Sequence, residues 1–126
     1  MTNKILIVDD EPEIIKLVER ILEYENLSLD IITASNGAEA LERVISEMPD
    51  LILLDIKIPK INGYEVCRRV KSHTEYKSIK VVMFTAKAYD KDRRKAFRVG
   101  ADGYFIKPFA NKDLVRLINL YLLKKR

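Results

Sequence analysis

The stretch LILLDIKIPKING, residues 51–63, places a carboxylate directly after four consecutive apolar residues. Four apolar residues in a row are typical of a strand buried on both faces, as the strands of a parallel sheet are. Asp55 therefore stands at the end of a buried strand, where an ionised group is costly unless something compensates its charge. Pro59 and Gly63 follow and predict a tight turn that leaves this carboxylate accessible.

Apolar runs alternate with helical periodicities along the whole chain. Strands are expected at 4–8, 28–34, 51–54, 79–85 and 103–106. Apolar residues at helical spacing predict helices after Pro12, after an N-cap at Asn36 and after Asn111. Segments 63–72 and 87–99 are also expected to be helical, and the second has a thin apolar stripe. This alternation predicts an α/β fold of the (βα)5 type, a doubly wound parallel sheet with right-handed crossovers.

Length and composition predict a single domain over residues 1–126, with 48% hydrophobic and 33% charged residues. These values argue against disordered, collagen-like and disulfide-rich proteins. Cys67 is the only cysteine, so it is expected to be a small buried residue and not part of a metal cluster. No apolar run approaches the roughly 20 residues of a membrane span, and acids directly follow the first apolar stretch. A cytoplasmic protein without a membrane partner is expected.

Polar side chains terminate the predicted strands at one edge of the sheet. Asp9 and Asp10 end the first strand, Asp55 the third and Thr85 the fourth, and Lys107 follows the fifth. In open parallel sheets, ligands bind outside the carboxyl ends of the strands, where the strand order reverses. If the first and third strands are neighbours, three carboxylates converge within a few ångströms.

Converging carboxylates raise one another's pKa unless a cation compensates their charge. Mg²⁺ suits a site with few carboxylates, some water and a phosphoryl oxygen still to be bound. Lys107 adds a positive charge, and this set of groups is what phosphoryl transfer requires. Asp55 is then the expected nucleophile, which attacks phosphorus and forms an acyl phosphate.

Four segments of the chain together resemble the receiver domain of two-component response regulators. They are ILIVDDEP at 5–12, LILLDIKIPKINGYE at 51–65, MFTAKA at 83–88 and GADGYFIKPF at 100–109. Each motif is weak alone, but four in order at matching strand ends are specific. The resemblance covers roughly residues 3–123 and implies a flavodoxin-like sheet with strand order 2-1-3-4-5, in a stand-alone receiver of the chemotaxis type.

The resemblance also implies roles for the acids at the sheet edge. Asp55 would accept a phosphoryl group from a sensor histidine kinase or a phosphotransfer protein. Asp55 and Asp10 would bind Mg²⁺ directly, Asp9 mostly through water, and the backbone carbonyl of Lys57 would complete the protein ligands. The Lys57 side chain is further expected to pair with an acid such as Asp9 or Glu11 and to make self-dephosphorylation slower than in a Lys57→Asn variant.

The family's conformational switch maps onto three more residues. Thr85 and Lys107 would bind phosphoryl oxygens, and the Lys107 to Pro108 bond would be cis. Phosphorylation would draw Thr85 inward and let the ring of Tyr104 rotate, which reshapes the surface of the fourth helix, fifth strand and fifth helix. A downstream protein would read that surface, and the chain would be a monomer or a weak phosphorylation-dependent dimer. Beyond self-phosphotransfer and slow self-dephosphorylation, no enzyme activity is expected.

Two alternatives stay open at this point. The chain can be the receiver part of a larger DNA-binding response regulator, or an Asp-nucleophile phosphatase, although that class requires a second Asp where Lys57 stands. Basic residues at 91–98 and in KKR at 124–126 predict either a solvated surface or a docking site for an acidic partner, with direct nucleic-acid binding disfavoured.

Overall fold

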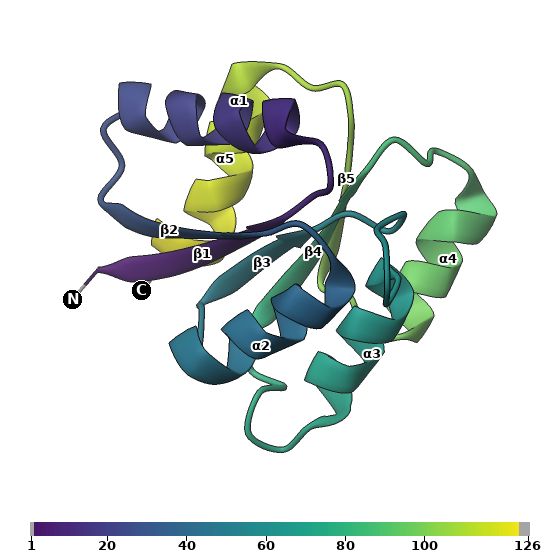
Figure 1. Cartoon of the computed structure of the whole chain (residues 1–126). Helices are drawn as coiled ribbons and strands as arrows, with labels where there is room; N and C mark the ends of the chain where they lie inside the picture. The colour runs from purple at the N-terminus through teal and green to yellow at the C-terminus, as the bar shows by residue number, and fades with distance from the viewer. Residues whose placement is uncertain (1, 124–126) are drawn as a thin grey trace.

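The computed structural model describes residues 2–123, which form a parallel sheet flanked by helices (Figure 1). The sheet has five strands in the order β2-β1-β3-β4-β5. The strands are β1 (Asn3–Val8), β2 (Leu29–Ala34), β3 (Leu51–Leu54), β4 (Lys80–Thr85) and β5 (Gly103–Ile106). All neighbouring strands pair in parallel. The predicted α/β class and strand order are therefore confirmed.

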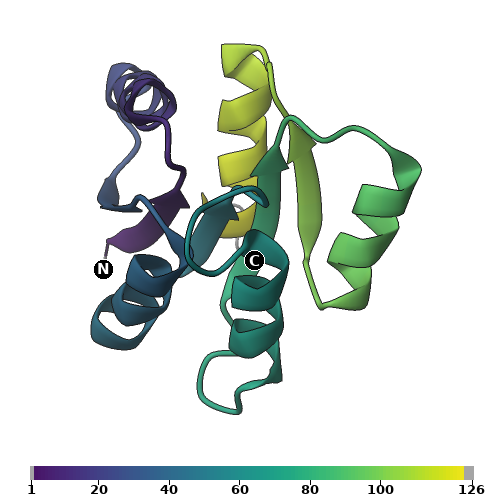
Figure 2. The ribbon, with the colours of Figure 1, turned by 45° about the vertical axis from the view of Figure 1, so that its right-hand side comes forward.

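The helices cover both faces of this sheet. They are α1 (Pro12–Tyr24), α2 (Gly37–Glu47), α3 (Gly63–Ser72), α4 (Asp90–Arg98), α5 (Asn111–Ile118) and a π-helical turn, η1 (Asn119–Leu123). Helices α1 and α5 lie on one face, and α2, α3 and α4 lie on the other (Figure 1). Figure 2 shows α4 beside β5 at one edge of the molecule. Because both faces are covered, every residue of β3 is buried.

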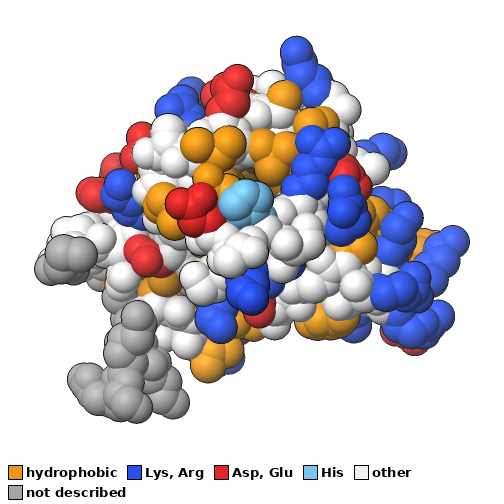
Figure 3. Space-filling view, turned by 90° about the horizontal axis from the view of Figure 1, so that it is seen from below, with side chains coloured by type: hydrophobic (Ala, Val, Ile, Leu, Met, Phe, Trp, Pro, Cys, Tyr) orange, Lys and Arg blue, Asp and Glu red, His pale blue; other side chains and the backbone are white. Residues whose placement is uncertain are grey.

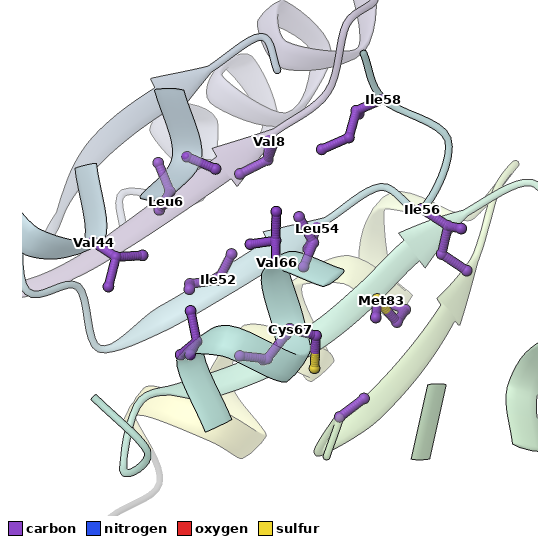
Figure 4. Packing of buried hydrophobic residues seen from close by; sticks show 14 of the residues in the cluster. Leu6, Val8, Val44, Ile52, Leu54, Ile56, Ile58, Val66, Cys67 and Met83 are labelled. Carbon is purple, nitrogen blue, oxygen red and sulfur yellow. The ribbon is translucent and has the colours of Figure 1, made fainter. Parts of the chain in front are cut away.

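Two apolar layers hold the helices to the sheet. Leu6, Ile52 and their alternate neighbours face α2 and α3, as Figure 4 shows, while Ile5 and Leu51 face α1 and α5. Cys67 lies fully buried within the first layer, as expected, and burial raises the pKa of its thiol to about 12. Successive strand residues point to opposite faces, so one apolar strand serves both layers.

The residues at the helix N-termini agree only in part with the capping residues expected from the sequence. Pro12 occupies the first turn of α1, and the Asn36 side chain accepts a hydrogen bond from the Glu39 N–H at 2.8 Å, as predicted. Asn62 caps α3 in the same way, which the sequence prediction missed. The helix expected after Asn111 begins at that residue, and its N-cap, Ala110, makes no side-chain hydrogen bond.

One predicted helix is shorter in the structure, and another changes its geometry near its end. Helix α4 begins at Asp90 and not near residue 87, because Tyr89 has an extended backbone with ψ 148°. Helix α5 ends at Ile118 and continues as a π-helical turn. Within residues 2–123, no helix combines the length and apolarity that crossing a membrane requires. The basic residues at 124–126 lie outside the described part of the chain.

Candidate functional site

The acidic residues follow the carboxyl ends of two adjacent strands. Val8 of β1 is in register with Leu54 of β3, so Asp9 and Asp55 leave the sheet side by side. The Asp55 N–H donates to the Val8 carbonyl at 3.0 Å, which fixes the backbone of this residue. One carboxylate oxygen from each of Asp9, Asp10 and Asp55 lies within 4.8 Å of the others. The predicted convergence of carboxylates is confirmed.

Lys107 reaches this cluster from the end of β5. Its Nζ donates to Asp9 Oδ2 at 2.8 Å and to Asp55 Oδ2 at 3.3 Å, above the ring of Phe84. Its backbone N–H donates to the Thr85 carbonyl at 2.8 Å. The bond between Lys107 and Pro108 is cis, as the resemblance implied. The ammonium group is thus held between two buried carboxylates.

Burial dominates the electrostatics of the cluster. Asp9 is fully buried, and burial raises its pKa even though Lys107 and the backbone N–H of Glu11 donate hydrogen bonds that lower it. For Lys107, burial alone would lower the pKa, but the hydrogen bond that its ammonium donates to Asp9 and the charge of Asp55 outweigh burial and raise the pKa. Lys107 is therefore paired with two of the three clustered carboxylates, Asp9 and Asp55.

A cavity of about 580 Å³ opens above the cluster. Thr85, Ala86 and Lys87 border it beside Asp55, and the apolar side chains of Ile14, Leu17 and Phe109 border it opposite. Sequence reasoning did not anticipate the apolar wall, although the helical spacing of Ile14 and Leu17 after an acidic strand end is a usable signal. The hollow is large enough for a small phosphoryl-bearing ligand to approach Asp55.

Lys57 lies at the rim of this cavity with its side chain exposed. Its backbone N–H donates to Asp55 Oδ1 at 3.4 Å. The expected ion pair between the Lys57 side chain and a neighbouring acid is wrong: among residues 2–123, no carboxylate lies within 4.0 Å of its Nζ. Asp9 is fully buried and pairs with Lys107 instead.

The two predicted switch residues lie on adjacent strands. Thr85 is almost fully buried, and its hydroxyl accepts a hydrogen bond from the Lys87 N–H at 3.3 Å. The half-buried Tyr104 donates its hydroxyl to the Lys87 carbonyl at 2.9 Å, and the Arg93 guanidinium lies over its ring at 5.0 Å. Burial, with the nearby Tyr64, raises the pKa of Tyr104 to about 12. Lys87 and Arg93 were not anticipated as its partners.

The donor set fits a hard divalent cation. Oxygen ligands about 2.1 Å from one Mg²⁺ lie at most about 4.2 Å apart. The three carboxylate oxygens lie within 4.8 Å of one another, so a shift of well under an ångström brings them to one ion. Carboxylate oxygens are the hard ligands that Mg²⁺ prefers, whereas histidine and cysteine ligands would favour softer metals.

These features match a known family over most of the chain. Residues 5–119 match the response regulator receiver domain. The chain belongs to the receiver domain family. This receiver domain therefore carries the module of two-component response regulators that the four sequence motifs resembled.

Two curated relatives from Bacillus subtilis (strain 168) are each 40% identical to this receiver domain. They are the alkaline phosphatase synthesis transcriptional regulatory protein PhoP, over 114 residues, and the transcriptional regulatory protein ResD, over 120 residues. The alignments cover 90% and 95% of this chain but 46% and 48% of the relatives. The chain thus spans about half the length of the curated relatives it matches.

Solved structures of response regulators share the fold over nearly their whole length. The chemotaxis response regulator CheY4 of Vibrio cholerae has a TM-score of 0.88 at 28% identity, covering 97% of this chain and 100% of that one. The phosphorylated cyanobacterial phytochrome response regulator RcpA has a TM-score of 0.89 at 25% identity, covering 100% and 98%.

Proposed function

We propose that this receiver domain accepts a phosphoryl group on Asp55 from a sensor histidine kinase or a phosphotransfer protein and passes the signal to a downstream protein. The observation that carries this proposal is the meeting of Asp9, Asp10, Asp55 and Lys107 at the carboxyl ends of β1, β3 and β5. Strand β3 fixes the nucleophile, and the turn after it leaves the carboxylate facing the cavity.

In the proposed reaction, Asp10 and Asp55 with the Lys57 carbonyl would hold Mg²⁺, and Asp9 would contact it through water. The metal supplies positive charge against the phosphoryl oxygens. The chain's own groups do the rest. Asp55 presents its oxygen for attack on phosphorus, while the bond from phosphorus to the donor's histidine nitrogen breaks and that nitrogen keeps the electron pair. Lys107 neutralises a second oxygen, and the Thr85 hydroxyl donates to a third. Among described residues, nothing donates to the Lys57 carbonyl, which leaves it free as a ligand.

The proposed output is a change of surface and not a further reaction. Movement of Thr85 towards a phosphorylated Asp55 shifts residues 86–87, and with them the carbonyl that Tyr104 now contacts at 2.9 Å. The ring of Tyr104 then rotates inward and leaves Arg93, which alters the surface formed by α4, β5 and α5. This shift redistributes two pre-existing conformations.

A mass measurement tests the proposal. The protein is incubated with Mg²⁺ and acetyl phosphate, and a gain of one phosphoryl group is expected on the peptide that contains Asp55. The Asp55→Asn variant should gain nothing, whereas the matched Asp30→Asn variant, altered at an exposed acid far from the site, should behave as the parent. Label on another residue, or consumption of many donor equivalents as by a phosphatase, would contradict the proposal.

A second candidate places the same phosphoacceptor in a DNA-binding regulator. It is supported by the names of PhoP and ResD, which are transcriptional regulators, and by the alignment with about half of each. An immunoblot of source cells separates the two: a native species near 14.6 kDa supports the stand-alone receiver, and one of about twice that mass supports the regulator.

A further inference from the structure

The positive charge of the chain is concentrated in one short segment. Residues 87–98, with the sequence KAYDKDRRKAFR, hold six basic and two acidic side chains. This excess of four equals the net charge of +4 of the whole chain, so acidic and basic residues balance outside the segment. We define the α4 basic face as Lys87, Lys91, Arg93, Arg94, Lys95 and Arg98.

Basic side chains on α2 and α3 are paired with acids, but those of the α4 basic face are not. Arg43 on α2 pairs with Glu39, and Arg68 and Arg69 on α3 both pair with Glu65. Among the described residues, no carboxylate lies within 4.0 Å of any basic group on the α4 basic face. Asp92 is buried, where it faces the Tyr64 hydroxyl, and is not available to the surface cations.

Aromatic groups lie among these cations. Lys95 lies over the Tyr64 ring at 4.5 Å, and Lys91 lies over Tyr89 at 5.9 Å. The Tyr89 side chain is 73% exposed and that of Phe97 is 46% exposed. In Figure 3, Lys and Arg side chains gather with hydrophobic ones on the right, the side where α4 lies in Figure 1. The α4 basic face is therefore both cationic and partly apolar.

We propose that the α4 basic face binds an acidic segment of a partner protein in which apolar side chains stand beside Asp and Glu. This inference rests on the proposed function, because it names the chemistry of the downstream target. Uncompensated cations favour an acidic partner by charge complementarity. A second copy docked face to face would bring six cations against six, which is repulsive.

A nucleic acid is the less complementary anion for this face. A phosphate backbone satisfies Lys and Arg but offers no apolar counterpart to Tyr89 and Phe97. An acidic peptide can offer both kinds of group from one short amphipathic segment. Arg93 contributes to the face and covers the Tyr104 ring at 5.0 Å, so rotation of that ring would alter the face directly. The affinity for the acidic segment is therefore expected to change when Asp55 is phosphorylated.

Fluorescence anisotropy with a defined probe tests the inference. The probe is a labelled peptide of about 12 residues in which Glu and Leu repeat at helical spacing, long enough to span α4. Binding to the unphosphorylated protein should weaken about tenfold in Arg94→Glu/Arg98→Glu, which reverses two exposed charges of the α4 basic face. The matched variant Lys16→Glu/Arg20→Glu makes the same charge change on exposed α1 positions and should bind within about twofold of the parent.

Two further measurements distinguish an acidic protein partner from a nucleic acid. Phe97→Ser should weaken peptide binding severalfold and leave a short duplex DNA probe unaffected. Equal weakening by both charge-reversed variants, or tighter binding of the DNA probe than of the peptide, would overturn the inference. Circular dichroism shows that each variant is folded. If Asp55 accepts phosphate but the peptide does not bind, this inference alone fails; if the peptide binds but no phosphate is accepted, the proposed function alone fails.

Discussion

Replacing Gly63 by alanine should have two opposing effects on stability: a gain from helix propensity and a loss from overpacking beside Asp55, the predicted phosphoacceptor. Gly63 is the first residue of α3, and its N–H donates to the Ile56 carbonyl at 2.8 Å. Alanine is favoured over glycine by up to about 1 kcal/mol inside a helix, so local preference predicts a more stable protein. A Cβ at this position, however, would contact the Asp55 carbonyl oxygen and lie 2.7 Å from the Ile56 Cα.

The structure sets the size of the packing penalty. Ordinary contact begins at 3.4 Å, so the backbone at Ile56 must recede by about 0.7 Å, the difference between 3.4 and 2.7 Å. That backbone is held because the Asp55 N–H donates to the Val8 carbonyl at 3.0 Å in the buried sheet. Overpacking against such a neighbour costs about 1–3 kcal/mol, which exceeds the helix gain. Misplacing Asp55 by nearly an ångström should also slow its phosphorylation by between about tenfold and a hundredfold.

Urea unfolding and the rate of phosphoryl gain from acetyl phosphate measure the two effects separately. Gly103→Ala is the control, because its Cβ would meet the Tyr121 hydroxyl at 2.5 Å, the end of a side chain that can move. That variant should lose less than about 1 kcal/mol. If Gly63→Ala is as stable as the parent or more stable, the packing argument is refuted, whatever the phosphorylation rate.

Three other predictions follow from single contacts. Cys67 has a pKa of about 12 against an ordinary 9.0, so at pH 8 the native protein should hold about a thousandfold less thiolate than the unfolded chain and resist alkylation by iodoacetamide. Hydrogen bonds from two arginines, of which that from Arg68 is the larger cause, lower the pKa of Glu65 from 4.5 to about 2. The stabilising contribution of the Glu65 carboxylate is therefore complete above pH 4.5 and disappears as the pH falls through 2. An NMR titration in which Arg68→Gln leaves this pKa unchanged would contradict that cause. Lys107→Ala leaves the fully buried carboxylate of Asp9 without its cation. This substitution should lower the free energy of unfolding, measured by urea denaturation in the presence of EDTA, by about 3–5 kcal/mol. A loss under about 1 kcal/mol would show that the fold does not need this ion pair.

The sheet could be predicted because its signal lies in the chain itself. A strand covered on both faces must be apolar at every position, and Leu51 and Ile52 enter opposite layers of the core. The limits of α4 could not be predicted in the same way. Only Asp92 and Ala96 of that helix are buried, so its sequence carries almost no apolar stripe to mark where it begins.

In the candidate site, too, some features could be predicted from the sequence and others could not. Acids at the ends of parallel strands must meet at one edge, so the convergence of Asp9 and Asp55 followed from topology. Which cation pairs with which acid depends on side-chain directions across separate loops. Asp9 pairs with Lys107 and not with Lys57, and no periodicity in the sequence encodes that choice. The roles of these residues in phosphoryl transfer stay predictions until phosphate is located on the chain.

The distribution of burial explains why a charge at Asp55 would be read out at α4 and not elsewhere. Strand β3, which ends at Asp55, is buried at every residue, so an added charge cannot displace it without disrupting both apolar layers. Helix α4 is joined to the sheet by a small apolar contact and by contacts that can exchange, such as Arg93 over Tyr104 and the Tyr104 hydroxyl on the Lys87 carbonyl. Elements with few buried apolar contacts rearrange at the lowest free energy. In the proposed switch, the rigid part of the fold therefore holds the charge, and the weakly packed helix changes in response to it.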